Sequence, residues 1–246
     1  MALREEYEKF GNWLFRWRSY VPLFLVALFL FELKYFRYPW NSESWDRCWE
    51  IFCLAISFFG LGIRVVTIGS TPKRTSGRNT ISGQVADVLN TSGMYSVVRN
   101  PLYLGNFFIV LGISLFMRSW WMTLTVVLAF FIYYEGIMFA EEEFLRRKFG
   151  AVYLEWAANT PLFVPRFKNW RPPSVPFSLR KALRREYSAL FAIIVSFTIL
   201  EIISDFYAEG RFVLDPMWAV IFAVGLIIYV LLRTLKKKSH LLNDRG

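Results

Sequence analysis

A polar stretch at residues 93–105 leads directly into a long apolar region, and a second polar cluster follows that region. The first stretch reads Gly93-Met94-Tyr95-Ser96-Val97-Val98-Arg99-Asn100-Pro101-Leu102-Tyr103-Leu104-Gly105. The second contains Glu141-Glu142-Glu143-Phe144-Leu145, Phe149-Gly150, Tyr153, Pro161 and Pro165. The apolar region between them is long enough for two helices that cross a bilayer and return. The sequence therefore predicts a hydrophobic hairpin that brings both polar clusters to the same membrane face.

The composition of the whole chain is that of a multi-pass membrane protein. Its 246 residues are 55% hydrophobic and 19% aromatic, with a mean hydropathy of +0.35, which is too apolar for an ordinary soluble domain. A spanning helix needs about 20 apolar residues, or slightly fewer when Lys, Arg, Trp and Tyr flank it. Six segments fit: 21–36, 48–68, 102–117, 120–140, 187–206 and 216–232. We expect an all-α, polytopic membrane helix bundle with about six transmembrane helices and no Rossmann sheet; the first and third segments are short enough for a re-entrant arm.

The chain is expected to form a single membrane domain over 1–246, which we divide into four segments. These are an amphipathic interfacial segment (1–19), a first helical hairpin with a polar loop (20–92), a motif core (93–167), and a basic linker with a C-terminal helical hairpin (168–246). The Gly-, Ser- and Thr-rich part of the loop, 69–92, is expected to be a plain linker, with a lid as the alternative. After the central hairpin we expect a separate charged helix from 141 to about 158, and a basic helix over 178–186.

The net charge of +10 is explained by membrane topology. With the N-terminus inside, 23 of the 29 basic residues fall in inner segments (1–19, 69–101, 141–186 and 233–246). This asymmetry follows the positive-inside rule and places both termini and the motif core on the cytoplasmic side. The basic loops are expected to face anionic lipid headgroups, and no nucleic-acid partner is needed to explain them. The sequence predicts no particular oligomeric state.

The sequence lacks the residues that several common catalytic chemistries require. The only histidine, His240, lies in the C-terminal tail, which removes Ser-His-Asp and Cys-His sites and His-ligated metals. No Cys-x-x-Cys pair, dinucleotide fingerprint or P-loop is present, and no metal site is expected. Chemistry must therefore use Arg, Glu, Tyr, Asn and backbone groups, or a cofactor with its own reactivity, such as a sulfonium methyl donor.

Arg99, Asn100 and Pro101 stand at the predicted start of the third apolar helix. Proline is well tolerated in the first turn of a helix. A helix N-terminus presents free backbone N–H groups and a positive dipole, and the Arg99 guanidinium adds further donors. This end of the hairpin is therefore predicted to favour an anion.

Glu135, Phe139 and Glu142 are spaced so that they share one face of the returning helix, whereas Glu141 points about 120° away. A carboxylate inside a membrane span is costly and is a functional candidate for that reason. The alternative for Glu135 is a structural ion pair with Arg64 or Arg99. For Glu141, Glu142 and Glu143 taken alone, the alternative is a solvated helix end.

The two clusters together resemble the isoprenylcysteine carboxyl methyltransferase and phospholipid methyltransferase family. The shared pattern is Gly-x-Tyr-x-x-x-Arg-(His)-Pro-x-Tyr-x-Gly and, after a hydrophobic hairpin, Glu-Glu-x-x-Leu-x-x-x-Phe-Gly-x-x-Tyr with a terminal Pro. It covers 93–167, about a third of the chain. The family's usual His is Asn100 here, and 133–140 lacks the Arg that the isoprenylcysteine enzymes carry shortly before their paired glutamates.

The resemblance implies an all-helical membrane methyltransferase that binds S-adenosylmethionine at the cytoplasmic end of the hairpin. Carried over by position, one wall of the cofactor site is formed by Tyr95, Arg99, Asn100, Pro101, Tyr103 and Gly105. The other wall is formed by Glu141 and Glu142, and Tyr153, Pro161 and Pro165 shape the segment that closes over it. The catalytic residues are expected to be Arg99, Glu142 and Tyr103. Substrate contacts are expected from Arg64, Glu135 and Phe139.

The available residues favour an acceptor that is already an anion. Methyl transfer to a lipid phosphate or carboxylate needs no general base, whereas an amine would need Glu135, Glu142 or Tyr103 to remove a proton. We therefore expect methylation of a membrane lipid or lipidated substrate at an anionic oxygen. The alternatives are isoprenylcysteine carboxyl O-methylation and phosphatidylethanolamine N-methylation. A small transporter or scaffold is the alternative of another class, although helices broken near mid-span and repeated halves, both typical of transporters, are not visible.

Overall fold

The computed structural model describes residues 3–17, 43–72, 75, 78–80, 83–210, 212 and 215–238. Helices dominate this part of the chain: α1 (Leu3–Arg16), α3 (Glu43–Gly69), α4 (Met94–Val97), α5 (Pro101–Phe116), α6 (Trp120–Phe149), α7 (Ala151–Asn159), α8 (Leu179–Glu209) and α9 (Pro216–Lys238). A short 3-10 helix, η2, covers Phe167–Asn169. The predicted span over 21–36 lies outside the described residues.

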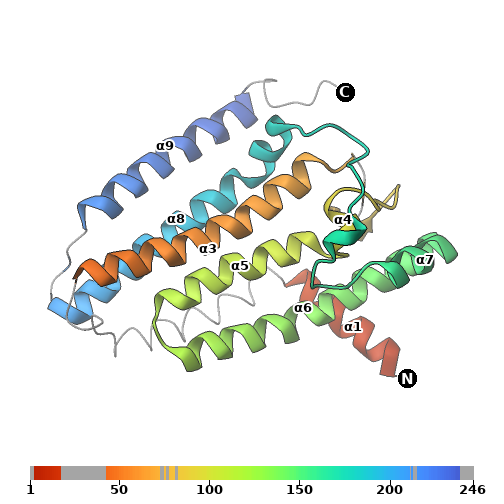
Figure 1. Cartoon of the computed structure of the whole chain (residues 1–246), viewed down its shortest axis with the longest axis horizontal. Helices are drawn as coiled ribbons and strands as arrows, with labels where there is room; N and C mark the ends of the chain where they lie inside the picture. Colours follow the sequence, from red (N-terminus) through yellow and green to blue (C-terminus); the bar gives the residue numbers. More distant parts are fainter. Residues whose placement is uncertain are drawn as a thin grey trace.

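The described helices form the expected membrane bundle. Four of them, α3, α6, α8 and α9, are long and apolar enough to cross a bilayer, and α5 is a shorter apolar helix. Figure 1 shows α9, α8, α3 and α5 running alongside one another, with α6 returning beside α5. The all-α class and the membrane location are therefore confirmed. In the described part of the polar loop the structure adds a small antiparallel hairpin, β1 (Arg78–Thr80) with β2 (Gly83–Val85).

Helices α3 and α5 approach each other closely because small residues line their contact. A methyl group added at Gly112 would overlap the Ser57 hydroxyl and the Cys53 carbonyl oxygen, and one added at Gly105 would lie 2.7 Å from the Gly60 carbonyl oxygen. The Ser57 hydroxyl donates a hydrogen bond to the Ile109 carbonyl at 2.9 Å. Small residues are the usual means of close helix packing in membranes. This contact places the start of α5 beside the C-terminal half of α3.

Helix α6 is longer than the sequence predicted, and the expected helix start at 141 was wrong. The helix continues without a break through Glu141, Glu142 and Glu143 because no helix-breaking residue occurs before Gly150. Gly150 has φ 55° and ψ −126°, a conformation that only glycine adopts readily. The paired glutamates therefore lie on the rigid end of a membrane helix, and only 151–159 forms the separate helix α7.

The C-terminal hairpin packs on the side of α3 that faces away from α6. Helix α8 begins at Leu179, where the Ser178 hydroxyl accepts a hydrogen bond from the Lys181 backbone N–H, and the predicted basic helix over 178–186 is its first part. Trp218 of α9 is buried against the ring of Phe197, and its indole N–H donates to Glu50 of α3 at 3.1 Å. This hairpin thus shares one core with α3.

Helix α1 docks on the C-terminal half of α6. Gly11 lies against Gly136, and the Tyr7 and Phe139 rings meet edge to face at 5.0 Å. Two ion pairs, Arg4 with Glu143 and Glu8 with Arg147, extend the contact. Leu14 is buried, whereas Phe10, Trp13 and Trp17 are exposed. Helix α1 therefore holds the part of α6 that carries the glutamates.

The close contact of α3 with α5 makes a testable prediction about two glycines. Gly112→Ala is expected to destabilise the protein by about 1–3 kcal/mol, because the added methyl overpacks a tight helix contact. Gly62→Ala is the matched control, since Gly62 of α3 has no atom within 4 Å of the added methyl, and alanine favours the helix. Thermal unfolding in detergent should show a lower Tm for the first variant alone; equal Tm values would contradict the packing described here.

Candidate functional site

An ion pair joins the two polar clusters at one end of the α5–α6 hairpin. Arg99 lies between α4 and α5, and its Nη1 is 3.0 Å from Oε2 of Glu142 on α6. The two side chains are 20% and 27% exposed. A partly buried charge needs a partner, and the hairpin supplies one from 43 residues away in the sequence.

Three buried polar atoms around this ion pair have no hydrogen-bond partner among the residues that the structure describes. They are Arg99 Nε, Glu142 Oε1 and the Tyr153 hydroxyl. Tyr153 lies on α7 and is 3% exposed; burial raises its pKa, and the negative charge of Glu142 raises it further, so the hydroxyl keeps its proton. Unsatisfied buried groups are costly and rare. A donor, an acceptor and a hydroxyl thus converge where a polar ligand would satisfy all three.

A Pro-rich strap, residues 161–178 between α7 and α8, is bound to the motif segment by its backbone. The Arg99 N–H donates to the Pro161 carbonyl, and the Arg166 N–H donates to the Val97 carbonyl, each at 2.9 Å. Further along, the Gly93 N–H donates to the Arg171 carbonyl, also at 2.9 Å. Figure 1 shows the strap passing α4 on its way from α7 to α8. The strap is therefore bound to the backbone at Arg99 itself and at two positions before it.

The loop before the motif also reaches the site. Ala86, fully buried, packs with Leu145 and Tyr153. The expected plain linker and its alternative, a lid, both stay predictions, and the end of the loop packs against Leu145 of α6 and Tyr153 of α7.

Tyr95 and Glu141 form a second contact between the predicted walls. Tyr95 is buried, and its pKa is raised first by burial and then by the negative charge of Glu141. The indole N–H of Trp156 donates to the Tyr95 carbonyl at 3.1 Å. Tyr95 is thus packed between α6 and α7 as a neutral side chain.

The remaining residues of the first predicted wall lie at the start of α5. Asn100 precedes the helix and donates to the Leu162 carbonyl at 3.3 Å, while Pro101 is its first residue and is buried. The Tyr103 ring lies 4.8 Å from the ring of Tyr134 on α6. Gly105 faces α3, in the close helix contact described above. The cofactor roles of these four residues stay predictions.

The three predicted substrate residues are not gathered in one place. Arg64 Nε and Nη2 donate to the two carboxylate oxygens of Glu186 at 2.7 and 2.8 Å. Glu135 and Phe139 lie beside Tyr7 of α1. The structural alternative for Glu135, an ion pair with Arg64 or Arg99, was wrong because each arginine holds another carboxylate. The substrate roles stay predictions.

Sequence reasoning missed Glu186, Asn106 and Tyr134, which surround Arg64. Asn106 Oδ1 accepts from Arg64 Nη1 at 2.6 Å, and its Nδ2 donates to the Tyr134 hydroxyl at 3.1 Å. The sequence signal that could have pointed to these residues was a polar residue in each apolar stretch, because a polar group inside a membrane costs free energy. Hydropathy alone does not tell which of them meet.

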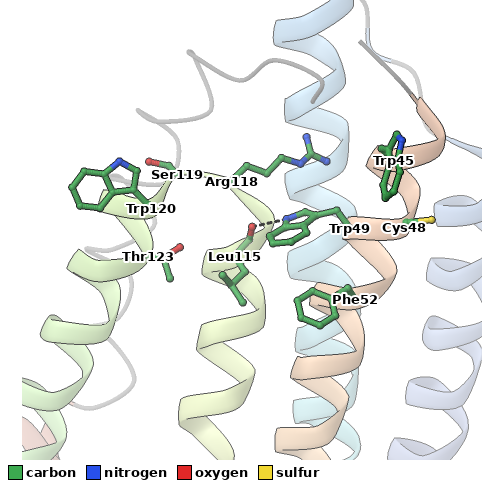
Figure 2. Close-up of a pocket in the computed structure, with 9 residues that line it drawn as sticks. All are labelled: Trp45, Cys48, Trp49, Phe52, Leu115, Arg118, Ser119, Trp120 and Thr123. Atoms are coloured by element: carbon green, nitrogen blue, oxygen red, sulfur yellow. Dashed lines mark hydrogen bonds between the residues drawn. The ribbon is translucent and has the colours of Figure 1, made fainter. Parts of the chain in front are cut away.

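A cavity of about 800 Å³ lies at the opposite end of α5. Figure 2 shows it between α3, the end of α5 and the start of α6, where the Trp49 indole N–H donates to the Leu115 carbonyl at 2.9 Å. Its described lining residues are Trp45, Cys48, Trp49, Phe52, Leu115, Arg118, Ser119, Trp120 and Thr123. A 16-residue helix is about 24 Å long, so this cavity is separate from the Arg99 site. Within the described ranges, no group of three or more His, Cys, Asp or Glu side chains could hold a metal ion.

The comparisons with known proteins agree with this geometry. Residues 50–152 match the family described as phospholipid methyltransferase, a stretch that includes Arg99 and Glu142. The chain is also 30% identical over 158 residues to the nickel-cobalt-cadmium resistance protein NccN of Alcaligenes xylosoxydans xylosoxydans, covering 64% of this chain and 67% of the relative. The chain belongs to the phospholipid methyltransferase family. It is therefore an integral membrane member of a methyltransferase family.

A second relative covers the same share of the chain. The cobalt-zinc-cadmium resistance protein CzcN of Cupriavidus metallidurans is 32% identical over 158 residues, which is 64% of this chain and 66% of the relative. The chain thus spans about two thirds of the length of the curated relatives it matches. No solved structure matches. The matched stretch of the phospholipid methyltransferase family ends before α8, so α8 and α9 lie outside it.

Proposed function

We propose that this phospholipid methyltransferase family member uses S-adenosylmethionine, bound at the Arg99–Glu142 ion pair. The observation that carries the proposal is the set of unsatisfied atoms, Arg99 Nε, Glu142 Oε1 and the Tyr153 hydroxyl. S-adenosylmethionine carries a carboxylate, an ammonium and ribose hydroxyls. The Arg99 N–H suits the carboxylate, Glu142 suits the ammonium or the ribose, and Tyr153 serves either. The residues present therefore fit the cofactor.

The protein's contribution to the reaction is binding, orientation and the exclusion of water. When bound, the cofactor supplies an activated methyl group on a sulfonium. The Arg99 backbone N–H is held by the Pro161 carbonyl, and its guanidinium is held by Glu142. The guanidinium therefore has little freedom to reorient. The strap binds the backbone around Arg99, and the buried Ala86 packs with Tyr153. A preorganised, water-poor site favours a transfer in which opposite charges are neutralised.

We propose an anionic lipid oxygen, a phosphate or a carboxylate, as the methyl acceptor. Near the ion pair, the Glu142 carboxylate is engaged with Arg99, and the raised pKa of Tyr153 keeps its hydroxyl protonated. An acceptor that is already deprotonated needs neither of them. The lipid is proposed to enter sideways from the bilayer toward Tyr103. N-methylation of phosphatidylethanolamine is the alternative and would require Glu135 or Glu142 as a base.

We also propose that the strap and the start of α8 lie on anionic lipid at the cytoplasmic face. Residues 156–185 carry seven Lys or Arg residues and no Asp or Glu. In the strap, Arg166, Lys168 and Arg171 are exposed and alternate with exposed Phe167 and Trp170. Basic side chains attract anionic headgroups, and aromatic rings favour the interface.

Cofactor binding is the first test. Calorimetry on detergent-purified protein should give S-adenosylmethionine binding with a micromolar Kd for wild type. Arg99→Ala and Glu142→Gln are expected to weaken it at least tenfold, on the order of 1.4 kcal/mol or more. Glu143→Gln is the matched control, because this neighbouring carboxylate pairs with Arg4 instead, and its Kd should stay within about twofold. Failure of folded wild-type protein to bind would overturn the proposal and favour a transporter or scaffold.

The acceptor class is tested with a labelled methyl group in nanodiscs. Phosphatidic acid, a prenylcysteine analogue and phosphatidylethanolamine are offered separately, and product is measured by lipid extraction. We expect label in one of the two anionic acceptors. Label in phosphatidylethanolamine alone, at a rate that rises with pH as the amine loses its proton, would refute the anionic-oxygen proposal.

Lipid contact of the strap is tested by charge removal. The triple change Arg166→Ala, Lys168→Ala, Arg171→Ala is expected to reduce retention of phosphatidylglycerol by the purified protein, measured by native mass spectrometry. The matched control removes the same charge from the end of α9, with Lys236→Ala, Lys237→Ala and Lys238→Ala. Equal retention in both triple variants would contradict a specific role of the strap.

A further inference from the structure

A partly buried polar network crosses four helices of the bundle beside the proposed site. Glu186 of α8 is 4% exposed and receives two hydrogen bonds from Arg64 of α3, at 2.7 and 2.8 Å. Arg64 also donates to Asn106 of α5 at 2.6 Å, and Asn106 donates to the Tyr134 hydroxyl of α6 at 3.1 Å. The network ends at the Tyr134 ring, which contacts the Tyr103 ring at 4.8 Å.

The chemistry of these groups gives the network one direction. A guanidinium can only donate, so the oxygen of the Asn106 amide must face Arg64 and its nitrogen must face Tyr134. The Tyr134 hydroxyl therefore accepts this bond. The bidentate hydrogen bonding to Glu186 fixes the plane of the Arg64 guanidinium. A change at Glu186 would thus reach Tyr134 through the orientation of Arg64 and Asn106.

We propose that Glu186 is a positioning residue for the methyl-transfer site, acting through Arg64 and Asn106 on the Tyr134–Tyr103 pair. This inference rests on the proposed function, because Tyr103 lies in the first turn of α5, four residues after Arg99. It gives α8 a role in the reaction, although this helix lies outside the stretch matched by the family. Figure 1 shows α8 lying along α3, the arrangement that brings Glu186 to Arg64.

The positioning role differs from the headgroup contact expected for Arg64 from the sequence. Glu186 already neutralises the Arg64 guanidinium, so an incoming anion would have to displace a buried carboxylate. If Arg64 bound the headgroup of the acceptor, its loss would raise the KM for the acceptor. A positioning network predicts a lower kcat at saturating acceptor with the KM little changed.

The test compares Glu186→Gln with Glu201→Gln. Both carboxyls lie on α8 and are buried, 4% and 7% exposed, but Glu201 contacts Glu50 near the other end of the helix. We expect Glu186→Gln to lower kcat at least tenfold while the Kd for S-adenosylmethionine stays within about twofold. Glu201→Gln should leave both unchanged. A similar loss in both variants, or a loss of kcat that only tracks a lower Tm, would overturn the proposal.

A second readout does not depend on methyl transfer. With 3-fluorotyrosine at position 134, the ¹⁹F resonance should shift in Glu186→Gln and in Arg64→Lys, and stay in place in Glu201→Gln. An unmoved resonance in Glu186→Gln overturns the positioning network even if the enzyme is active. A shifted resonance in a protein that binds no S-adenosylmethionine supports the network and refutes the proposed function, so the two failures are distinguishable.

Discussion

The ion pair between Arg99 and Glu142 is the interaction on which the site depends. It closes the open end of the α5–α6 hairpin and holds together two motifs that belong to different helices. Neither charge is stable alone in a partly buried position. The pair also leaves one donor and one acceptor unsatisfied beside the Tyr153 hydroxyl. The same contact that stabilises the hairpin therefore leaves polar atoms that a zwitterionic ligand would satisfy.

The rest of the bundle restrains this pair from three directions. The strap binds the backbone at Gly93, Val97 and Arg99. Helix α1 holds the C-terminal half of α6 through Gly11, Tyr7 and its ion pairs with Glu143 and Arg147. The close packing of α3 on α5 places Arg64 beside Asn106. In a membrane, where burial of apolar surface does not drive helices together, such polar and small-residue contacts carry much of the specificity.

Much of the fold was predictable because hydropathy is a local property of the chain. The apolar stretches of α3, α5, α6, α8 and α9 were all predicted, as was Pro101 at the start of α5. The error at 141 has a clear cause: a run of glutamates was taken for a helix start, but the helix continues until Gly150, whose positive φ ends it. A charged run does not break a helix; a residue that cannot continue it does.

The sequence by itself determined the membrane class, most helix positions, the absence of common catalytic motifs in the chain and the family motif that contains Arg99, Glu142 and Tyr153. Only the tertiary structure decided which charges meet. Arg64 pairs with Glu186, not with Glu135, and Gly105 serves the contact with α3. The physical reason is that apolar length and turn residues act locally, whereas an ion pair depends on the rotation and depth of two separate helices. Partners 122 residues apart, such as Arg64 and Glu186, are set by packing.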